Sequence, residues 1–160
     1  LEIFGVDPWS LYDDYGNPKG VERMNQQYES SLERLKPYPN CKLIKKTSME
    51  AVKDFENDSL DFVYIDGNHW FKYVTEDICE WSKRVKEGGI ICGHDYIYTK
   101  SKSTCGGCHA HYVVDAYTAA LGIKNWWVIG EKHGKPGEKR DKWRSWMWVN
   151  PKRTFNIIPN

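Results

Sequence analysis

The sequence predicts an α/β fold with a mainly parallel sheet, helices on both faces of the sheet and an antiparallel strand near the C-terminus. Apolar stretches of strand length alternate with stretches in which apolar residues recur every three or four positions, the period of a helix. Neither an internal repeat nor a low-complexity linker divides the 160 residues. We therefore expect a single domain over residues 1–160.

The first half of the chain predicts two strands and two helices. In chain order these elements cover residues 1–6, 21–36, 42–46 and 49–55. Pro37 should end the first helix, and Ser48 should cap the second. Strands that alternate with helices in this way are expected to run parallel.

The second half predicts four strands and two helices. In chain order they cover residues 60–65, 70–86, 89–93, 111–121, 125–129 and 143–149. Gly88 and Gly89 should break the helix before the next strand begins. A charged loop joins the last two strands, so strand 143–149 should run antiparallel near one edge of the sheet. The parallel core of the sheet should contain residues 2–6, 42–46, 60–65 and 89–93.

Composition excludes several classes of function. The 23 Lys and Arg residues nearly balance the 22 Asp and Glu residues, so neither a nucleic-acid partner nor a polybasic membrane surface is expected. No apolar run has the length of a membrane span, and no signal segment opens the chain. Five cysteines without regular spacing indicate a reducing compartment, which for this chain we take to be the cytoplasm.

Two cysteines stand close together in a run that also contains two histidines. Cys105 and Cys108 have the spacing of metal, redox and haem-attachment motifs, and His109 and His111 follow them. A zinc site needs about four ligands, usually as two such pairs, and the sequence has no second pair. We therefore expect two incidental thiols in a Gly-rich loop, with zinc at Cys105 and Cys108 as the less favoured alternative.

Polar side chains follow three of the predicted strands. Asp7 follows the first, Asp66 and His69 follow strand 60–65, and His94 and Asp95 follow strand 89–93. Ligands of parallel sheets bind beyond the carboxyl ends of the strands, so these side chains should converge. Two carboxylates could share a cation such as Mg²⁺, and a histidine could deprotonate a substrate hydroxyl. Alternatively, the acids only form turns and cap strand ends in water.

The residues around these clusters resemble a known family. Residues 60–69, 77–81 and 88–96 resemble the class I S-adenosylmethionine-dependent methyltransferases, in particular the small-molecule and sugar O-methyltransferases of the macrocin-type and cephalosporin-hydroxylase-like branch. Residues 6–9 and 47–51 resemble the same group. The resemblance implies a Rossmann-like sheet, S-adenosylmethionine as cofactor, and a hydroxyl of a small molecule or sugar as the acceptor.

The resemblance also implies cofactor-binding residues. Asp7 would bind the ribose of S-adenosylmethionine, and Ser48 and Met49 would lie near its adenine. Asp66 would lie beside the cofactor as well.

The same resemblance implies a catalytic base and a metal site. His69 would be the base, and Asp66, His94 and Asp95 would hold a divalent metal. Relatives often carry an acid in place of His94. An imidazole suits zinc, iron or manganese better than Mg²⁺, so a softer ion than Mg²⁺ is an alternative.

The sequence departs from the family pattern at its start. The family has a strand with a Gly-rich turn, which cradles the methionine part of the cofactor, and none precedes Val6. We therefore expect an N-terminally truncated domain. The missing strand would lie between the strands that end at Asp7 and Asp66. Three alternatives follow: an upstream segment supplies the strand, the two strands pair directly, or another chain fills the gap.

These observations leave two further expectations open. A truncated Rossmann-like module that no longer binds the cofactor, and is not catalytic, is the alternative to an O-methyltransferase. An open strand edge and a group of aromatic side chains also predict a homo-oligomer. The tryptophans concerned are Trp126, Trp127, Trp143, Trp146 and Trp148.

Overall fold

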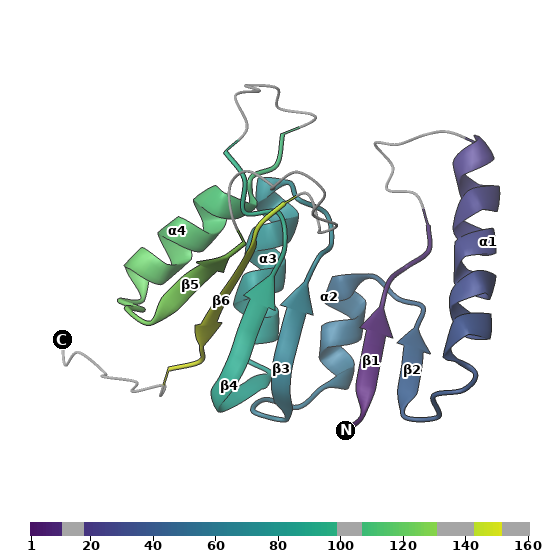
Figure 1. Ribbon diagram of the computed structural model, residues 1–160, viewed down its shortest axis with the longest axis horizontal. Coiled ribbons are helices and arrows are strands. Elements are labelled where there is room, and N and C mark those ends of the chain that lie inside the picture. Colours follow the sequence, from purple (N-terminus) through teal and green to yellow (C-terminus); the bar gives the residue numbers. More distant parts are fainter. Residues whose placement is uncertain (11–17, 99–106, 131–142, 152–160) are drawn as a thin grey trace. The chain divides into compact units, whose positions relative to one another are not determined.

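The computed structural model describes residues 1–10, 18–98, 107–130 and 143–151 (Figure 1). The chain forms two compact units, Leu1–Asp54 and Phe55–Asn160, and each is described by itself. None of the described helices has the length and apolar character needed to cross a membrane.

The first unit is a pair of parallel strands with helices. Its elements are β1 (Ile3–Val6), α1 (Pro18–Leu35), β2 (Cys41–Ile44), α2 (Ser48–Ala51) and the 3₁₀ helix η2 (Val52–Asp54). Strand β1 pairs in parallel with β2, so that Val6 lies opposite Ile44 and the two carboxyl ends meet. This unit therefore has the strand–helix–strand order that the sequence predicts.

The predicted cap of α2 is wrong by one residue. Thr47, not Ser48, is the N-cap, because Glu50 lies three residues after it and the two form a capping box. The Glu50 carboxylate accepts hydrogen bonds from the Thr47 backbone amide (3.0 Å) and the Thr47 hydroxyl (2.6 Å). These bonds lower the pKa of Glu50. The helix is also shorter than predicted, because the chain continues as η2 from Val52.

The second unit is a mixed sheet with two helices. Its elements are β3 (Leu60–Ile65), α3 (Phe71–Ser82), β4 (Val85–Gly93), α4 (Ala110–Ala120), β5 (Trp126–Ile129) and β6 (Ser145–Val149). The strand order is β3-β4-β6-β5. Strands β3 and β4 are parallel, whereas β6 is antiparallel to both of its neighbours. The α/β fold class and its antiparallel C-terminal strand are confirmed.

The prediction of one continuous sheet is wrong within the described part of the chain. Residues 3–6 and 41–44 form one sheet, and residues 60–65 and 85–93 belong to another. The alternative that the strands ending at Asp7 and Asp66 pair directly is therefore not observed. Among the described residues, β1 and β3 each pair with one strand and leave their second edge open. The family resemblance puts a further strand beside each of these edges.

The boundary between α3 and β4 also differs from the prediction. The helix ends at Ser82, and β4 begins at Val85, so Gly88 and Gly89 lie inside a strand. The register explains this difference, because Leu60 pairs with Val85 and Phe62 with Ile90, which leaves a bulge in β4. Gly88 has φ +77°, and a Cβ on Gly89 would lie 2.7 Å from the Asp61 carbonyl oxygen.

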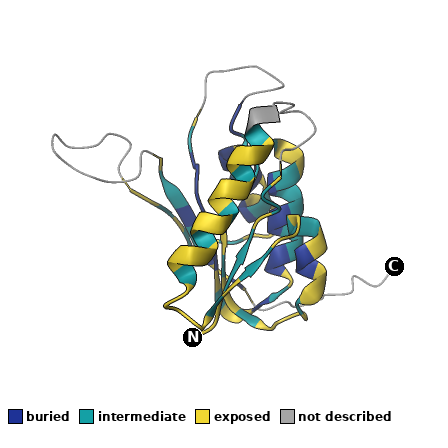
Figure 2. Ribbon diagram, turned by 90° about the vertical axis from the view of Figure 1, so that its right-hand side faces the viewer, coloured by how far each residue is buried: buried dark blue, intermediate teal, exposed yellow. Residues whose placement is uncertain are grey.

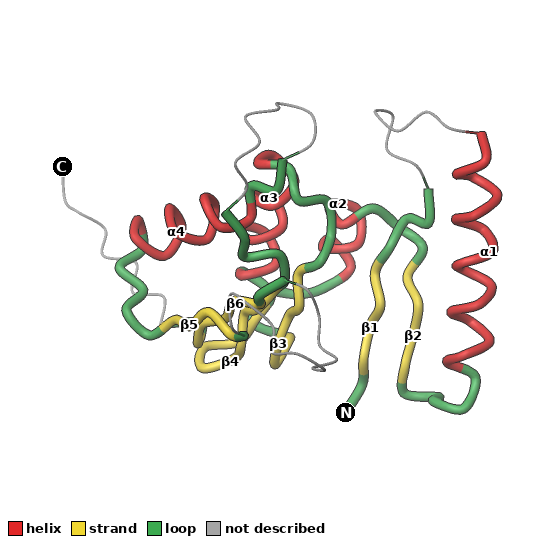
Figure 3. Tube along the Cα trace, turned by 45° about the horizontal axis from the view of Figure 1, so that its top comes forward, coloured by secondary structure: helices red, strands yellow, loops and turns green. Residues whose placement is uncertain are grey.

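The core of the second unit lies between its sheet and its two helices. Both helices lie over the same face of the sheet (Figure 3). Trp146 and Trp148 are buried there, with stacked rings 5.0 Å apart. Side chains alternate between the two faces of a strand, so both rings lie on the core face. These two tryptophans therefore do not belong to the exposed aromatic surface that the sequence suggested. The other buried core residues come mainly from β3, β4, α3 and α4: Ile65, Val74, Ile78, Val85, Ile91, Val113 and Val114.

The opposite face of this sheet is apolar and exposed. Cross-strand pairing aligns seven apolar side chains on it, which we call the open face: Phe62, Tyr64, Ile90, Cys92, Trp127, Met147 and Val149. Tyr64 is 50% exposed and Trp127 48%. Buried residues gather instead on the helical side (Figure 2). Within the described part of this unit, helices cover one face of the sheet and not the other.

Candidate functional site

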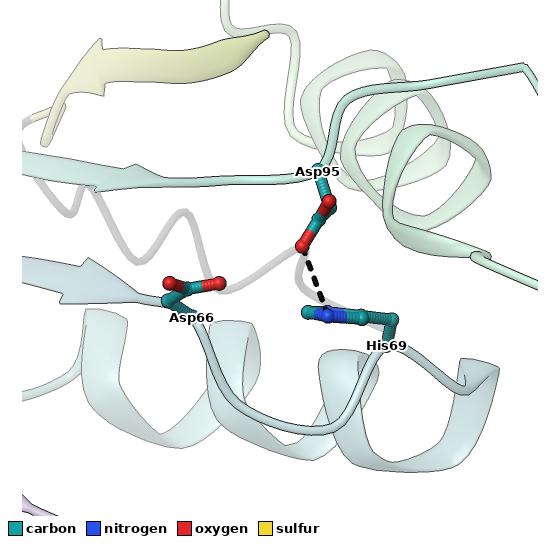
Figure 4. A group of neighbouring side chains, drawn as sticks. All are labelled: Asp66, His69 and Asp95. Atoms are coloured by element: carbon teal, nitrogen blue, oxygen red, sulfur yellow. Dashed lines mark ion pairs between the residues drawn. The ribbon is translucent and has the colours of Figure 1, made fainter. Parts of the chain in front are cut away.

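The carboxyl ends of β3 and β4 meet and place polar side chains together. Asp66 follows β3 directly, and His94 and Asp95 follow β4. The His94 backbone amide donates to the Ile65 carbonyl at 3.0 Å, which holds the two strand ends side by side. His69 lies in the loop between β3 and α3 (Figure 4).

Three of these side chains point toward a common space (Figure 4). The Nε2 atom of His69 lies 2.9 Å from Oδ2 of Asp95. The Nδ1 atom of His94 lies 3.4 Å from the same oxygen of Asp95 and 3.9 Å from Oδ1 of Asp66. The structure thus brings together the four residues that the sequence placed at this edge of the sheet.

Asp95 is the buried centre of the cluster, and its backbone is strained. Its φ of 59° lies in the left-handed region, which residues other than glycine, asparagine and aspartate rarely adopt. The Asp95 carbonyl accepts hydrogen bonds from the Ile97 amide at 2.8 Å and the Cys108 thiol at 3.2 Å. On one side, the Trp146 indole donates to the His94 carbonyl at 2.9 Å. Strain held by several neighbours is typical of functional sites.

The cluster fits a divalent cation. One donor atom each from Asp66, His69 and Asp95 lies within 4.8 Å of the other two. Ligand atoms about 2.0–2.6 Å from one ion have separations of this size. The side chains of Asp66 and His69 are 52% and 42% exposed, so this space is open to solvent. The group differs from the expected set, because it contains His69 where the sequence suggested His94.

The expected cofactor residues Asp7, Ser48 and Met49 lie in the first unit. The Asp7 amide donates to the Ile44 carbonyl at 3.3 Å, so Asp7 lies at the joint end of β1 and β2. Ser48 is the first residue of α2, close to the same end of the pair. The Asp7 carboxylate accepts a hydrogen bond from the Trp9 amide, as the alternative of a turn-forming residue predicted. Asp7 also lines an open hollow with Trp9 and polar side chains of α1.

Sequence reasoning missed the part of Cys108 and His109 in this site. Besides the thiol bond to Asp95, the His109 backbone amide donates to the His69 carbonyl at 2.8 Å. The His109 Nδ1 atom accepts a hydrogen bond from the Phe71 amide at 3.1 Å. Burial raises the pKa of the Cys108 thiol, which keeps it protonated. The signal was the cysteine–histidine run itself, whose other cysteine, Cys105, lies outside the described residues.

Comparisons with known proteins point to one kind of domain. A family model described as a methyltransferase domain matches residues 1–96. A protein of Sinorhizobium fredii, named uncharacterized protein y4gI, is 29% identical over 100 residues. The match covers 59% of this chain and 10% of that protein, so the chain corresponds to a small part of it.

Solved structures share the fold at low sequence identity. The O-methyltransferase NovP aligns with 94% of this chain at a TM-score of 0.55 and 14% identity. An O-methyltransferase family protein from Burkholderia thailandensis aligns with 96% at a TM-score of 0.59 and 11% identity. An rRNA methylase from Streptococcus thermophilus aligns with 94% at a TM-score of 0.53 and 10% identity. The chain spans 60%, 52% and 74% of these proteins, respectively, and the likeness concerns their fold.

Proposed function

Because the chain belongs to the methyltransferase domain family, we propose that it is an S-adenosylmethionine-dependent O-methyltransferase. The proposed acceptor is a hydroxyl of a small molecule or sugar. The observation that supports this proposal most strongly is the contact between His69 and Asp95, 2.9 Å, beside Asp66 at the joined ends of two parallel strands. Ligands of α/β sheets bind at such ends.

His69 is the proposed general base. Asp95 holds Nε2 of the imidazole, and a carboxylate in this position fixes the ring and leaves the other nitrogen, Nδ1, to accept a proton. His69 would take the proton of the acceptor hydroxyl at Nδ1, and the acceptor oxygen would then attack the methyl group that the cofactor, once bound, would supply. S-adenosylmethionine supplies the methyl group as an electrophile on a positively charged sulfur. The protein contributes position and charge.

The proposed cofactor-binding residues in the first unit are Asp7, Ser48 and Met49. In the second unit the proposed cofactor-binding residue is Asp66. An acid at the end of a strand accepts hydrogen bonds from a ribose diol in nucleotide-binding sheets. Asp7 has this position at the end of β1.

A divalent cation bound at this cluster is proposed to assist the methyl transfer. Asp66 and Asp95 would hold it together with His94, whose Nδ1 atom lies 3.9 Å from Oδ1 of Asp66 and 3.4 Å from Oδ2 of Asp95. A bound cation would make the acceptor hydroxyl more acidic. His69 also belongs to the group of candidate ligands, and its Nε2 atom cannot hold both the cation and the Asp95 carboxylate. The two carboxylates and His94 therefore form the proposed metal set, and His69 stays the base.

The test is methyl transfer from radiolabelled S-adenosylmethionine to a panel of small hydroxyl compounds and sugars. We expect His69→Ala to lower turnover by about 10²–10⁴-fold, the usual contribution of a general base. The affinity for the cofactor should change little, because the base acts on the acceptor. A variant with full turnover would remove the assignment of His69.

A metal titration tests the proposed cation. We expect Mn²⁺ to bind the wild-type protein in calorimetry and Asp95→Asn to weaken binding, since the change removes a charge and keeps the shape. Asp61→Asn is the matched control, because Asp61 is an exposed carboxylate on β3 outside the cluster. Equal binding to all three proteins would exclude the metal site.

A further inference from the structure

We propose that His109 is a positioning residue of this site, which holds the loop that carries His69. The proposal rests on the proposed function, because positioning matters only if His69 reacts. His109 lies at the start of α4, 40 residues beyond His69 in the sequence, yet two of its atoms contact the His69 loop.

The first contact caps α3 from outside the helix. The first backbone amides of a helix lack partners within the helix, and a side chain at the N-cap usually supplies one. Trp70 occupies the N-cap of α3, and its side chain makes no such bond. The amide of Phe71, the first residue of the helix, donates instead to Nδ1 of His109 at 3.1 Å. Asn68 accepts from the Trp70 amide at 3.0 Å, which closes the loop before the helix.

The second contact holds His69 itself. The His109 backbone amide donates to the His69 carbonyl at 2.8 Å. His109 therefore contacts residues on both sides of Trp70, at His69 and at Phe71. Its side-chain bond fixes where the helix begins, and its backbone bond fixes the peptide of the proposed base.

The neighbouring residue holds the opposite loop. The Cys108 thiol donates to the Asp95 carbonyl at 3.2 Å, at the residue with the left-handed backbone. His69 and Asp95 meet at 2.9 Å across the two loops. The short segment Cys108–His109 thus contacts both His69 and Asp95, the pair on which the proposed chemistry depends.

His109 acts through His69 and has no direct part in the reaction. Its Nδ1 atom already accepts the Phe71 amide, and His109 does not belong to the group of possible metal ligands in the described residues. Loss of its side chain would free the start of α3 and let the His69 imidazole shift. A displacement of about 1 Å can cost roughly 10²-fold in rate.

The test compares His109→Ala with His109→Asn. The amide oxygen of asparagine can take the place of Nδ1 as acceptor, whereas alanine offers none. We expect His109→Ala to lower kcat by about 10–100-fold and to leave the KM for S-adenosylmethionine nearly unchanged. His109→Asn should recover most of the turnover. Tyr112→Phe is the control from the start of the same helix, because Tyr112 is exposed and lies outside both loops, and it should leave turnover unchanged.

Hydrogen exchange of the Phe71 amide gives a readout that does not depend on activity. We expect it to exchange about tenfold faster in His109→Ala than in the wild type, and to regain protection in His109→Asn. Equal turnover of His109→Ala and wild type, or an asparagine variant as impaired as the alanine variant, would overturn the proposal. If wild-type protein neither binds the cofactor nor transfers methyl groups, the proposed function fails, and the exchange data still decide whether His109 fixes the loop.

Discussion

At the scale of single residues, Asp95 combines two unusual features. Its carboxylate faces two histidines, and its backbone has a left-handed φ of 59°. Aspartate and asparagine adopt this conformation more easily than other residues with a side chain, because their short polar groups bond locally. One position therefore serves both the turn after β4 and the proposed chemistry.

This combination predicts different effects of two substitutions on stability. Asp95→Asn keeps a residue that tolerates the left-handed conformation, whereas Asp95→Ala does not, so the alanine variant should be less stable by about 1 kcal/mol. Urea unfolding of both variants measures this difference. Equal free energies of unfolding would show that the backbone of Asp95 is not strained.

His111 predicts a pH dependence of stability. Its side chain is fully buried against tyrosine rings. Burial lowers its pKa from 6.5, although the nearby Asp115 carboxylate opposes this. The unfolded chain therefore takes up the proton first as the pH falls below 6.5, and the free energy of unfolding decreases toward the lower folded pKa.

The measurement is urea unfolding between pH 5 and 8 for the wild type and His111→Phe (about the range in which histidine titrates). The wild type should lose stability below about pH 6.5, and the variant should lose less over the same range. Parallel stability curves for the two proteins would show that His111 does not cause the dependence.

At the scale of elements, Asn150 explains why β4 begins earlier than the sequence suggested. Its side-chain amide donates to the Val85 carbonyl at 2.7 Å and the Lys86 carbonyl at 3.3 Å. Its backbone amide donates to the Gly89 carbonyl at 2.8 Å, and its carbonyl accepts the Gly88 amide at 3.0 Å. Asn150, which directly follows β6, thus provides hydrogen-bond partners for the backbone groups of the β4 bulge.

Removal of this side chain should destabilise the second unit. Asn150→Ala leaves buried carbonyl groups without their donor, which costs about 1–3 kcal/mol. Asn125→Ala, at an exposed asparagine just before β5, is the control and should change stability by less than about 0.5 kcal/mol. The free energies of unfolding in urea measure both effects, and similar values would contradict the structural role of Asn150.

The same element shows what the sequence could and could not predict. Trp81 and Val85 are both buried and stand four residues apart, which continues the helical pattern of α3 although Val85 already belongs to β4. The local pattern cannot show that Asn150, 65 residues away, provides the hydrogen bonds of a strand. The caps of α2 and α3 differ in the same way. Thr47 and Glu50, which cap α2, are three residues apart, whereas His109, which accepts the first amide of α3, lies far from Phe71 in the sequence.

At the scale of the whole molecule, the sequence predicted the fold class and the residues that meet at the end of β3 and β4. Asp66 and His94 end neighbouring strands, so the parallel order alone was enough to bring them together. The sequence left the pairing of the strands that end at Asp7 and Asp66 open, because an apolar strand does not reveal which strand pairs with it. The contacts of Cys108 and His109 also depend on tertiary structure.

The open face of the second sheet predicts self-association. Its seven apolar side chains adjoin the edge of β3, which is unpaired within the described part of the chain. Exposed apolar patches and open edges favour contact with another chain, and we expect a second copy of this one. Tyr64→Lys should shift the protein toward the monomer, whereas Tyr112→Lys, at an exposed tyrosine of α4, should not. Light scattering over a range of concentrations measures the mass, and a wild type that stays monomeric at every concentration would exclude the association.

Binding of S-adenosylhomocysteine, measured as a thermal shift, tests whether this chain binds the cofactor of a methyltransferase. A ligand that binds the folded state stabilises it by about 2.7 kcal/mol when its concentration is 100 times the dissociation constant. We predict a rise in Tm that increases with ligand concentration and is smaller for Asp7→Ala, whose residue is the proposed ribose ligand. A folded protein whose Tm does not change at any ligand concentration would contradict the methyltransferase function and favour a module that does not bind the cofactor.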